Sequence, residues 1–383
     1  MFRALVLIAV SFSPNAVAAS LYVNCNNGQS LNSALSRLDP KAPNTVWVQG
    51  TCTEYVHVTG FDGLTLKALP GARLVQPSTN PAPGIAAAVL LIDSSRSVTV
   101  DGFTVNSPST GNPPIGIGHG SGDIRLRNLI VNGGGHGIVI FERSQVSISR
   151  ATVRDQGFAS VGIYDQSDVH MEGGCLFEST TGAPWHVGIN VGSSHLTLRG
   201  VTIRNMQIGI NVSAGGSVNV QNTANYYPTD EASEVLIESP AGTNINGISL
   251  NDNATVSVSD AVLRIPGAGQ SWGGNTGGIL AAGESSLDAN SNLVISSSLG
   301  QGIVVMDSSH ATLNGSSITA GLHGGVVVAN LSTLSAGSPT GISGNSVDLF
   351  CDSKSLISGS ANIVGASVVQ CGSLSQGTTV PLP

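Results

Sequence analysis

The sequence predicts an all-β solenoid, a parallel β-helix of about eleven rungs. A short Gly-apolar-x-apolar segment recurs roughly every two dozen residues along the chain. Each repeat contains three short stretches in which apolar and polar residues alternate, the period of a strand with one buried face. No helical pattern separates one repeat from the next. Strands joined only by bends pair with the equivalent strands of neighbouring repeats, so stacking buries one continuous apolar column.

Residues 1–18 have the features of a signal peptide. Arg3 supplies a short positive segment, Ala4–Val10 is an apolar run, and Ala16-Val17-Ala18 is a small-x-small cleavage site. The alternative is an uncleaved membrane anchor, which needs about 18 consecutive apolar residues, whereas serine, proline and asparagine interrupt this run from residue 11. We therefore expect a secreted protein, periplasmic or extracellular, with no membrane anchor in the mature chain.

Residues 19–45 are expected to form an N-terminal cap, and residues 46–383 the β-helix. An open solenoid end exposes unpaired strand edges, which invite polymerisation. A helix starting at Ser30 and stopped by Pro40 is predicted to cover that end. Its apolar positions fall on one face: Leu31, Ala34, Leu35 and Leu38.

The repeats define the three strands of each rung. The first strand opens at each of these pairs: Gly116-Ile117, Gly137-Ile138, Gly162-Ile163, Gly188-Ile189, Gly209-Ile210, Gly247-Ile248, Gly278-Ile279, Gly302-Ile303 and Gly325-Val326. The bend between the second and third strands carries residue types that tolerate a left-handed backbone. These are Gly102, Asn128, Gly173, Gly200, Asn222, Asp260 and Gly315.

Five cysteines in an exported chain indicate disulfides. We predict Cys25–Cys52 near the N-terminus and Cys351–Cys371 near the C-terminus. Cys175 occupies a position that is apolar in other repeats, so a buried free thiol is favoured over a reactive one.

The stretch Thr45–Glu54 resembles the start of the first rung of many exported β-helix proteins. Together with the repeats, it makes the chain similar to the pectate-lyase-like superfamily of right-handed parallel β-helices over nearly all of its mature length. The resemblance implies a groove along one strand face in which long sugar chains lie. It does not fix the function, because this scaffold hosts lyases, hydrolases, epimerases, tailspikes and inert stalks.

Two specific activities of that superfamily are disfavoured by the sequence. Gly118-His119-Gly120 and Gly135-His136-Gly137 match one polygalacturonase motif, but the Asn-Thr-Asp and Asp-Asp motifs that carry the acids are absent. An inverting hydrolase needs two carboxylates flanking the scissile bond. Calcium would need a cluster of acidic oxygens, and the first-strand columns hold no acidic ladder. We expect no metal site and no cofactor.

The charge distribution favours an acidic polysaccharide as partner. A net charge of −8 argues against nucleic acid. Half of the basic residues of the mature chain and half of its eight histidines nevertheless lie between Arg125 and Arg204. Arginine binds carboxylates through a planar fork. The alternative is a solvated charge ladder, because acidic residues share this window. Oligomeric state stays open.

His119 and Asp165 break the pattern of one buried column. This column lies two residues after the isoleucine of each opening Gly-Ile pair. Elsewhere this column is apolar, as at Ile140 and Val191. Breaks in a consistent pattern mark functional sites or compensated strain. The alternative is that a shortened bend turns both side chains outward.

These observations give two function hypotheses. The first is an exported β-helix that binds or modifies an acidic polysaccharide. The candidate catalytic residues are His136, Tyr164, Asp165 and His186, with Arg143 neutralising a uronate carboxylate. The candidate substrate-binding residues are His119, Trp185, Asn190, Asn211, Tyr226 and Trp272. The second hypothesis is a non-catalytic surface adhesin or structural β-helix.

Two insertions, residues 221–244 and 265–276, interrupt the repeats. They carry Tyr226, Tyr227 and Trp272, and with Trp185 these aromatic residues are predicted to line a wall beside the first-strand face. The alternative is a loop packed on itself.

Overall fold

The computed structural model describes most of the chain. The described residues are 18–78, 87–180, 186–221, 235–238, 246–259, 261–264, 277–290, 293–296, 300–319, 324–337, 340–345, 347–359, 363–364 and 369–371.

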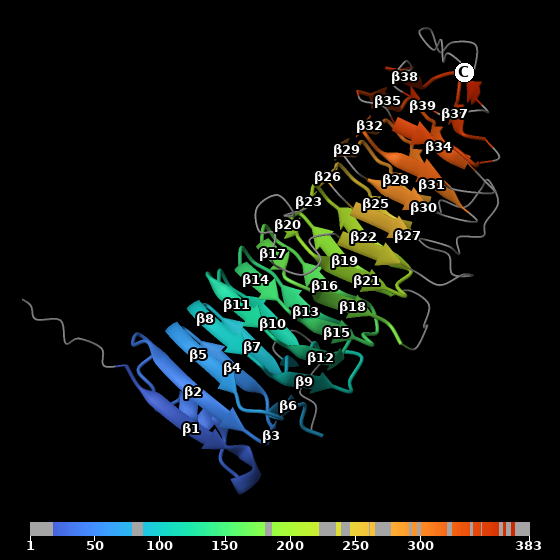
Figure 1. The fold of residues 1–383 in the computed structure, drawn as a ribbon. Helices are drawn as coiled ribbons and strands as arrows, with labels where there is room; N and C mark the ends of the chain where they lie inside the picture. The colour runs from blue at the N-terminus through green and yellow to red at the C-terminus, as the bar shows by residue number, and fades with distance from the viewer. Residues whose placement is uncertain are drawn as a thin grey trace, which may run out of the picture.

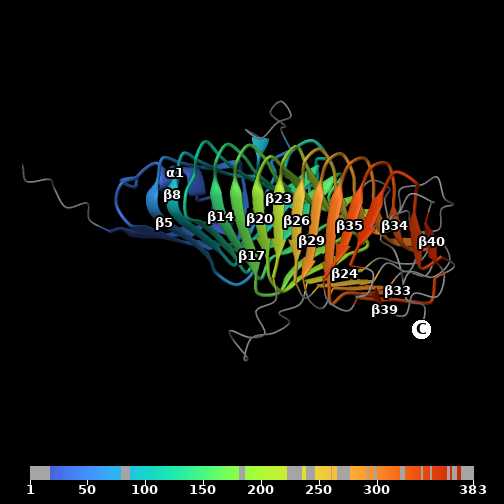
Figure 2. The same cartoon turned by 90° about the horizontal axis from the view of Figure 1, so that it is seen from above.

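The described residues form a right-handed parallel β-solenoid of about twelve turns, which confirms the predicted fold class. Their strands make three parallel sheets of 13, 14 and 13 strands, and each strand pairs with its equivalents one turn before and one turn after. Figure 1 shows the turns following one another in sequence order along a rod. Seen from above, the strands of one sheet cross the rod side by side (Figure 2).

We name the sheets by the order of strands in a repeat. The first sheet contains β4 (Val56–Thr59), β7 (Leu90–Asp93), β10 (Ile115–Gly118), β13 (His136–Ile140), β16 (Ala159–Ile163), β19 (Val187–Gly192), β22 (Ile208–Ser213), β25 (Asn246–Leu250), β28 (Gly277–Ala281), β31 (Gln301–Val305), β34 (Gly324–Val328), β37 (Leu349–Cys351) and β40 (Val369–Cys371).

The second sheet contains β1 (Ser20–Asn24), β2 (Asn44–Gln49), β5 (Asp62–Ala68), β8 (Arg96–Asp101), β11 (Ile124–Arg127), β14 (Gln145–Ser149), β17 (Asp168–Glu172), β20 (His195–Leu198), β23 (Ser217–Val220), β26 (Thr255–Val258), β29 (Ser286–Asn290), β32 (His310–Asn314), β35 (Thr333–Ala336) and β38 (Leu356–Ser358).

The third sheet contains β3 (Thr51–Thr53), β6 (Arg73–Val75), β9 (Thr104–Ser107), β12 (Ile130–Gly133), β15 (Thr152–Arg154), β18 (Cys175–Glu178), β21 (Val201–Arg204), β24 (Val235–Glu238), β27 (Ala261–Arg264), β30 (Val294–Ser296), β33 (Ser317–Thr319), β36 (Thr340–Ile342) and β39 (Ile363–Val364).

The core is the stack of inward-facing Val, Ile and Leu side chains from the three sheets. In β14, Val146 and Ile148 are buried while Gln145 and Ser147 are exposed, as period-two alternation predicts. The bend between the second and third sheets also follows the prediction, because Gly102, Asn128 and Gly173 have left-handed backbones. The same holds for Gly200 and Gly315, whereas Asn222 and Asp260 lie outside the described residues.

The register of two turns differs from the sequence-based alignment. That alignment puts His119 and Asp165 in the buried column of Ile140. In the structure Ile140 pairs with Ile117 on one side and Ile163 on the other. His119 and Asp165 instead lie in the bend that follows, with left-handed backbones of φ 52° and 57°. The expectation that they break the core column was wrong, and the alternative of outward side chains is correct.

A column of buried serines lies where the first sheet bends into the second. The Oγ atoms of Ser167, Ser194 and Ser309 each accept the backbone N–H of the serine one turn earlier, at 3.1–3.2 Å. Ser144 Oγ also donates to the carbonyl of Phe141 at 2.8 Å. The serine hydroxyls thus satisfy buried backbone donors that the tight bend leaves outside the strand ladders.

The N-terminal end is built differently from the prediction. The helix α1 (Leu31–Leu35) is shorter than expected, although Leu31, Ala34 and Leu35 are buried as predicted. The outer edge of the second sheet is β1, paired with β2, so a helix covering that sheet edge is not confirmed. Within the described part of the chain, no helix is long and apolar enough to cross a membrane.

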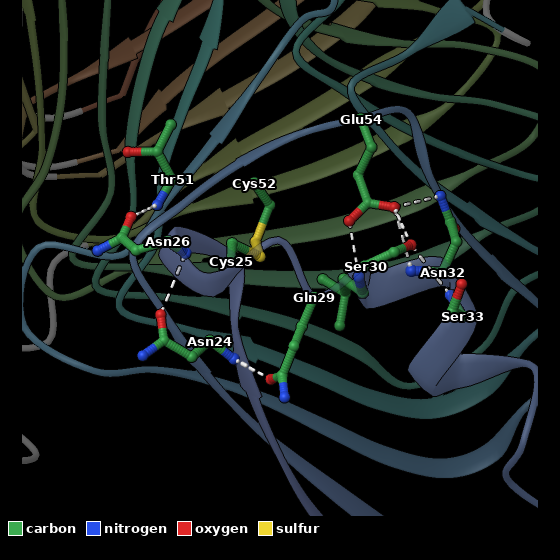
Figure 3. Close-up of a disulfide and its surroundings, with 11 residues drawn as sticks. Asn24, Cys25, Asn26, Gln29, Ser30, Asn32, Ser33, Thr51, Cys52 and Glu54 are labelled. Atoms are coloured by element: carbon green, nitrogen blue, oxygen red, sulfur yellow. Dashed lines mark hydrogen bonds between the residues drawn. A yellow bond between two sulfur atoms is a disulfide. The ribbon is translucent and has the colours of Figure 1, made fainter.

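A disulfide and a carboxylate fix this end (Figure 3). Cys25, in the 3-10 helix η1 (Cys25–Asn27), is bonded to Cys52 of β3, as predicted. Beside it the Glu54 carboxylate accepts the backbone N–H groups of Leu31 and Asn32 at 2.6 and 3.2 Å. A carboxylate is favourable there because the first N–H groups of a helix have no partner within the helix.

The other cysteines are consistent with the sequence-based expectations. Cys175 is a buried free thiol, and burial raises its pKa, so it stays protonated. Cys351 is disulfide-bonded, and the backbone register sets it opposite Cys371. The side chain of Cys371 lies outside the described residues, so that pairing stays a prediction.

Candidate functional site

Four predicted site residues form one hydrogen-bonded ladder on the outer face of the first sheet. The Tyr164 hydroxyl lies 3.2 Å from His136 Nε2 and accepts from Asn190 Nδ2 at 2.9 Å. Asn190 Oδ1 in turn accepts from Asn211 Nδ2 at 2.8 Å. The structure therefore brings together His136, Tyr164, Asn190 and Asn211 from four successive turns.

Burial keeps both titratable members of the ladder neutral at pH 7. It lowers the pKa of His136 below its usual 6.5. Burial also raises the pKa of Tyr164 above 10.0, and the hydrogen bond from Asn190 opposes this shift in part. Since Asn190 donates to the Tyr164 oxygen, the hydroxyl proton is free to point at a neutral His136 Nε2. The arrangement holds a proton between the two residues and leaves neither charged.

Glycines beside the ladder make room for aromatic rings. A Cβ at Gly118 would lie 2.2 Å from Cζ of Phe141, and a Cβ at Gly162 would lie 2.7 Å from Cε2 of Tyr164. The outer ends of both rings therefore occupy the places of missing side chains. Phe158, which is 44% exposed, adds a third ring at 5.1 Å from that of His136, centroid to centroid.

A cleft of about 700 Å³ adjoins the ladder, in the bend between the first and second sheets. It is lined by His119, Gly120, Glu142, Arg143, Asp165, Gln166 and Ser193. Tyr164 and Asp165 are consecutive, so the ladder and this bend cleft meet at that point. Three predicted residues, His119, Arg143 and Asp165, therefore share the cleft.

His119 lies between two carboxylates. Its Nδ1 contacts Asp93, and its Nε2 lies 3.3 Å from Glu142 Oε2. The ring is 58% exposed, so both contacts are solvated and individually weak. Asp93 and Glu142 were not predicted as site residues, because the register error displaced His119 from the bend that all three share.

Arg143 is the cation of the bend cleft. Its Nε donates to Gln166 Oε1 at 3.0 Å, and the backbone N–H of Arg143 donates to the carbonyl of Asp165 at 2.8 Å. Among the described contacts, no carboxylate pairs with its terminal nitrogens. Those nitrogens are therefore available for an anionic ligand in the cleft.

Consecutive left-handed residues recur along this bend and do not mark the cleft itself. Glu142-Arg143 and Asp165-Gln166 have φ between 54° and 63°, and so do Asp252-Asn253 and Asp307-Ser308 farther along the rod. A second cleft of about 480 Å³ lies on the same bend near Glu284, Asp307 and Lys354. What distinguishes the first cleft is its contact with the ladder and the aromatic rings.

The remaining predicted residues do not join this site within the described structure. His186 is only 5% exposed, and its Nδ1 bonds to Ser179 Oγ at 2.9 Å. Burial lowers the pKa of His186, and the negative charge of Asp155 opposes this shift. Trp185, Tyr226, Tyr227 and Trp272 lie outside the described residues, and so does the aromatic wall predicted from them.

The arginines of the basic window do not gather on one face. Arg125 pairs with Asp123 at 2.8 Å beside β11, while Arg154 and Arg204 pair with Glu178 and Glu238 on the third sheet. Arg199 donates to Gln221 at 2.6 Å. Much of the window is thus a set of local pairs, and only Arg143 contributes to the bend cleft.

Metal binding has little support in the described part of the chain. There the one group of cysteine and acidic side chains close enough to share an ion is Cys25, Cys52 and Glu54. Its thiols are consumed in the disulfide, and its carboxylate is bonded to the start of α1.

No protein-family model matches the sequence, and no curated protein matches it. Among solved structures, the chain is similar to the surface adhesin PfbA of Streptococcus pneumoniae, at 12% identity and a TM-score of 0.43, covering 82% of this chain and 89% of that one. It is also similar to an alginate lyase from Paenibacillus sp. str. FPU-7, at 13% identity and a TM-score of 0.37, covering 93% and 98%.

A third similar structure is the catalytic domain of a GH87 alpha-1,3-glucanase in complex with tetrasaccharides, at 11% identity and a TM-score of 0.38, covering 97% of this chain and 71% of that one. The neighbours thus include polysaccharide-acting proteins, as the resemblance implies. Similarities this distant say nothing about what this chain binds or does. The evidence for its function has to come from the site.

Proposed function

We propose that this chain is an exported β-helix protein that binds a polysaccharide, in the first place an acidic one, across the first sheet between β10 and β22. The observation that carries the proposal is the junction of the ladder with the bend cleft. There hydroxyl, amide and imidazole groups, partly exposed aromatic rings and one available guanidinium lie side by side. Sugars are bound by this combination of polar groups with apolar ring faces.

Export is part of the proposal. The support is the signal-peptide pattern of residues 1–18 and the Cys25–Cys52 disulfide, a bond that persists in oxidising compartments. When the full chain is expressed, the protein should be recovered outside the cytoplasm. Its mass should be that of a chain that starts at Ala19. A product that retains residues 1–18 in the cytoplasm would contradict export.

The acidic specificity is tested at Arg143. Calorimetry would compare oligogalacturonate and alginate oligosaccharides with neutral cello-oligosaccharides. Arg143→Ala should weaken binding of the acidic oligosaccharides about tenfold or more, because a hydrogen bond to a charged group contributes about 1.5–3 kcal/mol. Added salt should weaken wild-type binding.

The matched control is Arg125→Ala, because Arg125 is another exposed arginine but is paired with Asp123 on the second sheet. This control should bind like wild type. Equal losses in both variants would mean that overall charge, and not the bend cleft, attracts the ligand. Equal affinity for neutral and acidic oligosaccharides would contradict the acidic specificity.

A second candidate function is chemical modification of the same polymer. The observation that favours it is the 3.2 Å approach of the Tyr164 hydroxyl to His136 Nε2. A tyrosine that stays protonated can donate its proton to a sugar oxygen while a neutral imidazole accepts another. Mass spectrometry of incubated polymer would show shortened or unsaturated products with wild type and none with Tyr164→Phe. Binding without products would leave the non-catalytic function.

A further inference from the structure

At one place among the described turns, an outward column of the first sheet holds two aromatic residues flanked by glycines. Ile140 pairs with Ile163, so Phe141 and Tyr164, which follow them, occupy equivalent positions in consecutive turns. Four of the neighbouring outward positions are glycines: Gly116, Gly118, Gly162 and Gly192.

These glycines determine how the two rings lie. The ring end of Phe141 fills the place of a side chain at Gly118, one turn earlier. The ring of Tyr164 covers Gly162 of its own strand and also approaches Gly192, at 3.3 Å from an ideal Cβ to Cδ1. A ring whose outer end fills the outward position of a neighbouring residue lies flat against the sheet and does not project from it. Both residues are half-buried, as this geometry requires.

A ring lying along a sheet turns one π face toward the sheet and the other toward solvent. The π face is negative and attracts the slightly positive C–H groups on the apolar face of a pyranose. Arg143 follows Phe141 by two residues and lines the adjoining cleft. A guanidinium beside a stacking face suits a sugar that carries a carboxylate.

We infer that Phe141 and Tyr164 form a stacking platform for pyranose rings, and that Arg143 binds the carboxylate of a uronate seated on Phe141. This inference rests on the proposed function and names the sugar class that the first sheet recognises. Neighbouring turns of the rod are about 4.8 Å apart. The platform therefore offers two subsites along the rod axis, one per turn.

The decisive variant is Gly118→Ala, which leaves Phe141 in place but displaces its ring. The ideal Cβ would lie 2.2 Å from the ring, while the backbone of Gly118 is not left-handed and accepts alanine. We expect Gly118→Ala and Phe141→Leu each to weaken binding of an alginate or oligogalacturonate oligosaccharide about tenfold. In the Phe141→Leu background, Gly118→Ala should add little, because the ring it displaces is gone.

The matched control is Gly341→Ala in β36, where the nearest atom would lie 3.9 Å from the new Cβ. It should bind like wild type. Phe141→Leu keeps apolar bulk, and an unchanged melting temperature would show that the variant is folded. Wild-type affinity in both Gly118→Ala and Phe141→Leu would overturn the stacking platform while leaving the proposed function intact. A wild-type protein that binds none of these oligosaccharides would overturn both.

Discussion

At the scale of single residues, the candidate site is made mostly of side chains held neutral. His136 and Tyr164 have pKa values shifted away from neutrality in opposite directions, both by burial. A neutral pair of this kind offers hydrogen bonds to any ligand. It can transfer protons only when a bound substrate provides a donor and an acceptor. This is why we place binding before catalysis.

The buried histidines predict how stability depends on pH. Burial lowers the folded-state pKa of His136 and His186 below the usual 6.5. Between the lowered value and 6.5 the unfolded chain binds more protons than the folded chain, so the free energy of unfolding rises with pH in that window. The stability is fully present above pH 6.5 and is lost as the pH falls below it.

The measurement is the urea midpoint between about pH 7 and pH 5. His136→Gln and His186→Gln should each flatten the decline relative to wild type, because each removes one proton-binding difference. A wild-type midpoint that rises on acidification, or variants with the same slope as wild type, would contradict this reasoning.

At the scale of strands and bends, the sequence predicted the elements better than their register. Three alternating stretches per repeat and the left-handed residues of the second bend, such as Gly102 and Asn128, were sufficient to predict the solenoid. The register failed where both choices are apolar. Ile115 and Ile117 are both buried, and so are Val161 and Ile163. A period-two pattern looks the same after a shift of two residues, so only the pairing in space decides.

The buried serines were missed for another reason. Their signal is present, since Ser144, Ser167 and Ser285 each stand two residues before the first core residue of a second strand. Serine is common throughout this chain, so its placement carries little weight without knowledge of which backbone N–H groups the bend leaves unpaired.

The serine column makes a testable contribution to stability. Ser309→Ala would leave the buried N–H of Ser285 without its acceptor, now at 3.1 Å. We expect a loss of about 1–3 kcal/mol in the free energy of unfolding. Ser147→Ala, on the exposed face of β14, should change it by less than about 0.5 kcal/mol. Denaturant titration compares them, and equal effects would show that the Ser309 hydroxyl adds nothing specific.

At the scale of the whole rod, each turn contacts only its neighbours, so damage at one end stays local. The Cys25–Cys52 disulfide joins residues 27 apart in sequence. Its removal is expected to destabilise the first turns by about 3–4 kcal/mol on the loop-entropy estimate. In Cys25→Ser/Cys52→Ser, amide exchange should accelerate in β1 and α1 and stay unchanged in β29. Uniform acceleration along the rod would contradict nearest-neighbour stacking.

The same rod offers three long faces, and the central claim is that only one of them binds sugar, between β10 and β22 on the first sheet. The most direct test is a crystal structure of the protein with the tightest-binding acidic oligosaccharide. We expect the ligand to lie over Phe141 and Tyr164, with a carboxylate at Arg143. A ligand on the second or third sheet, or in the cleft near Glu284 and Lys354, would contradict it.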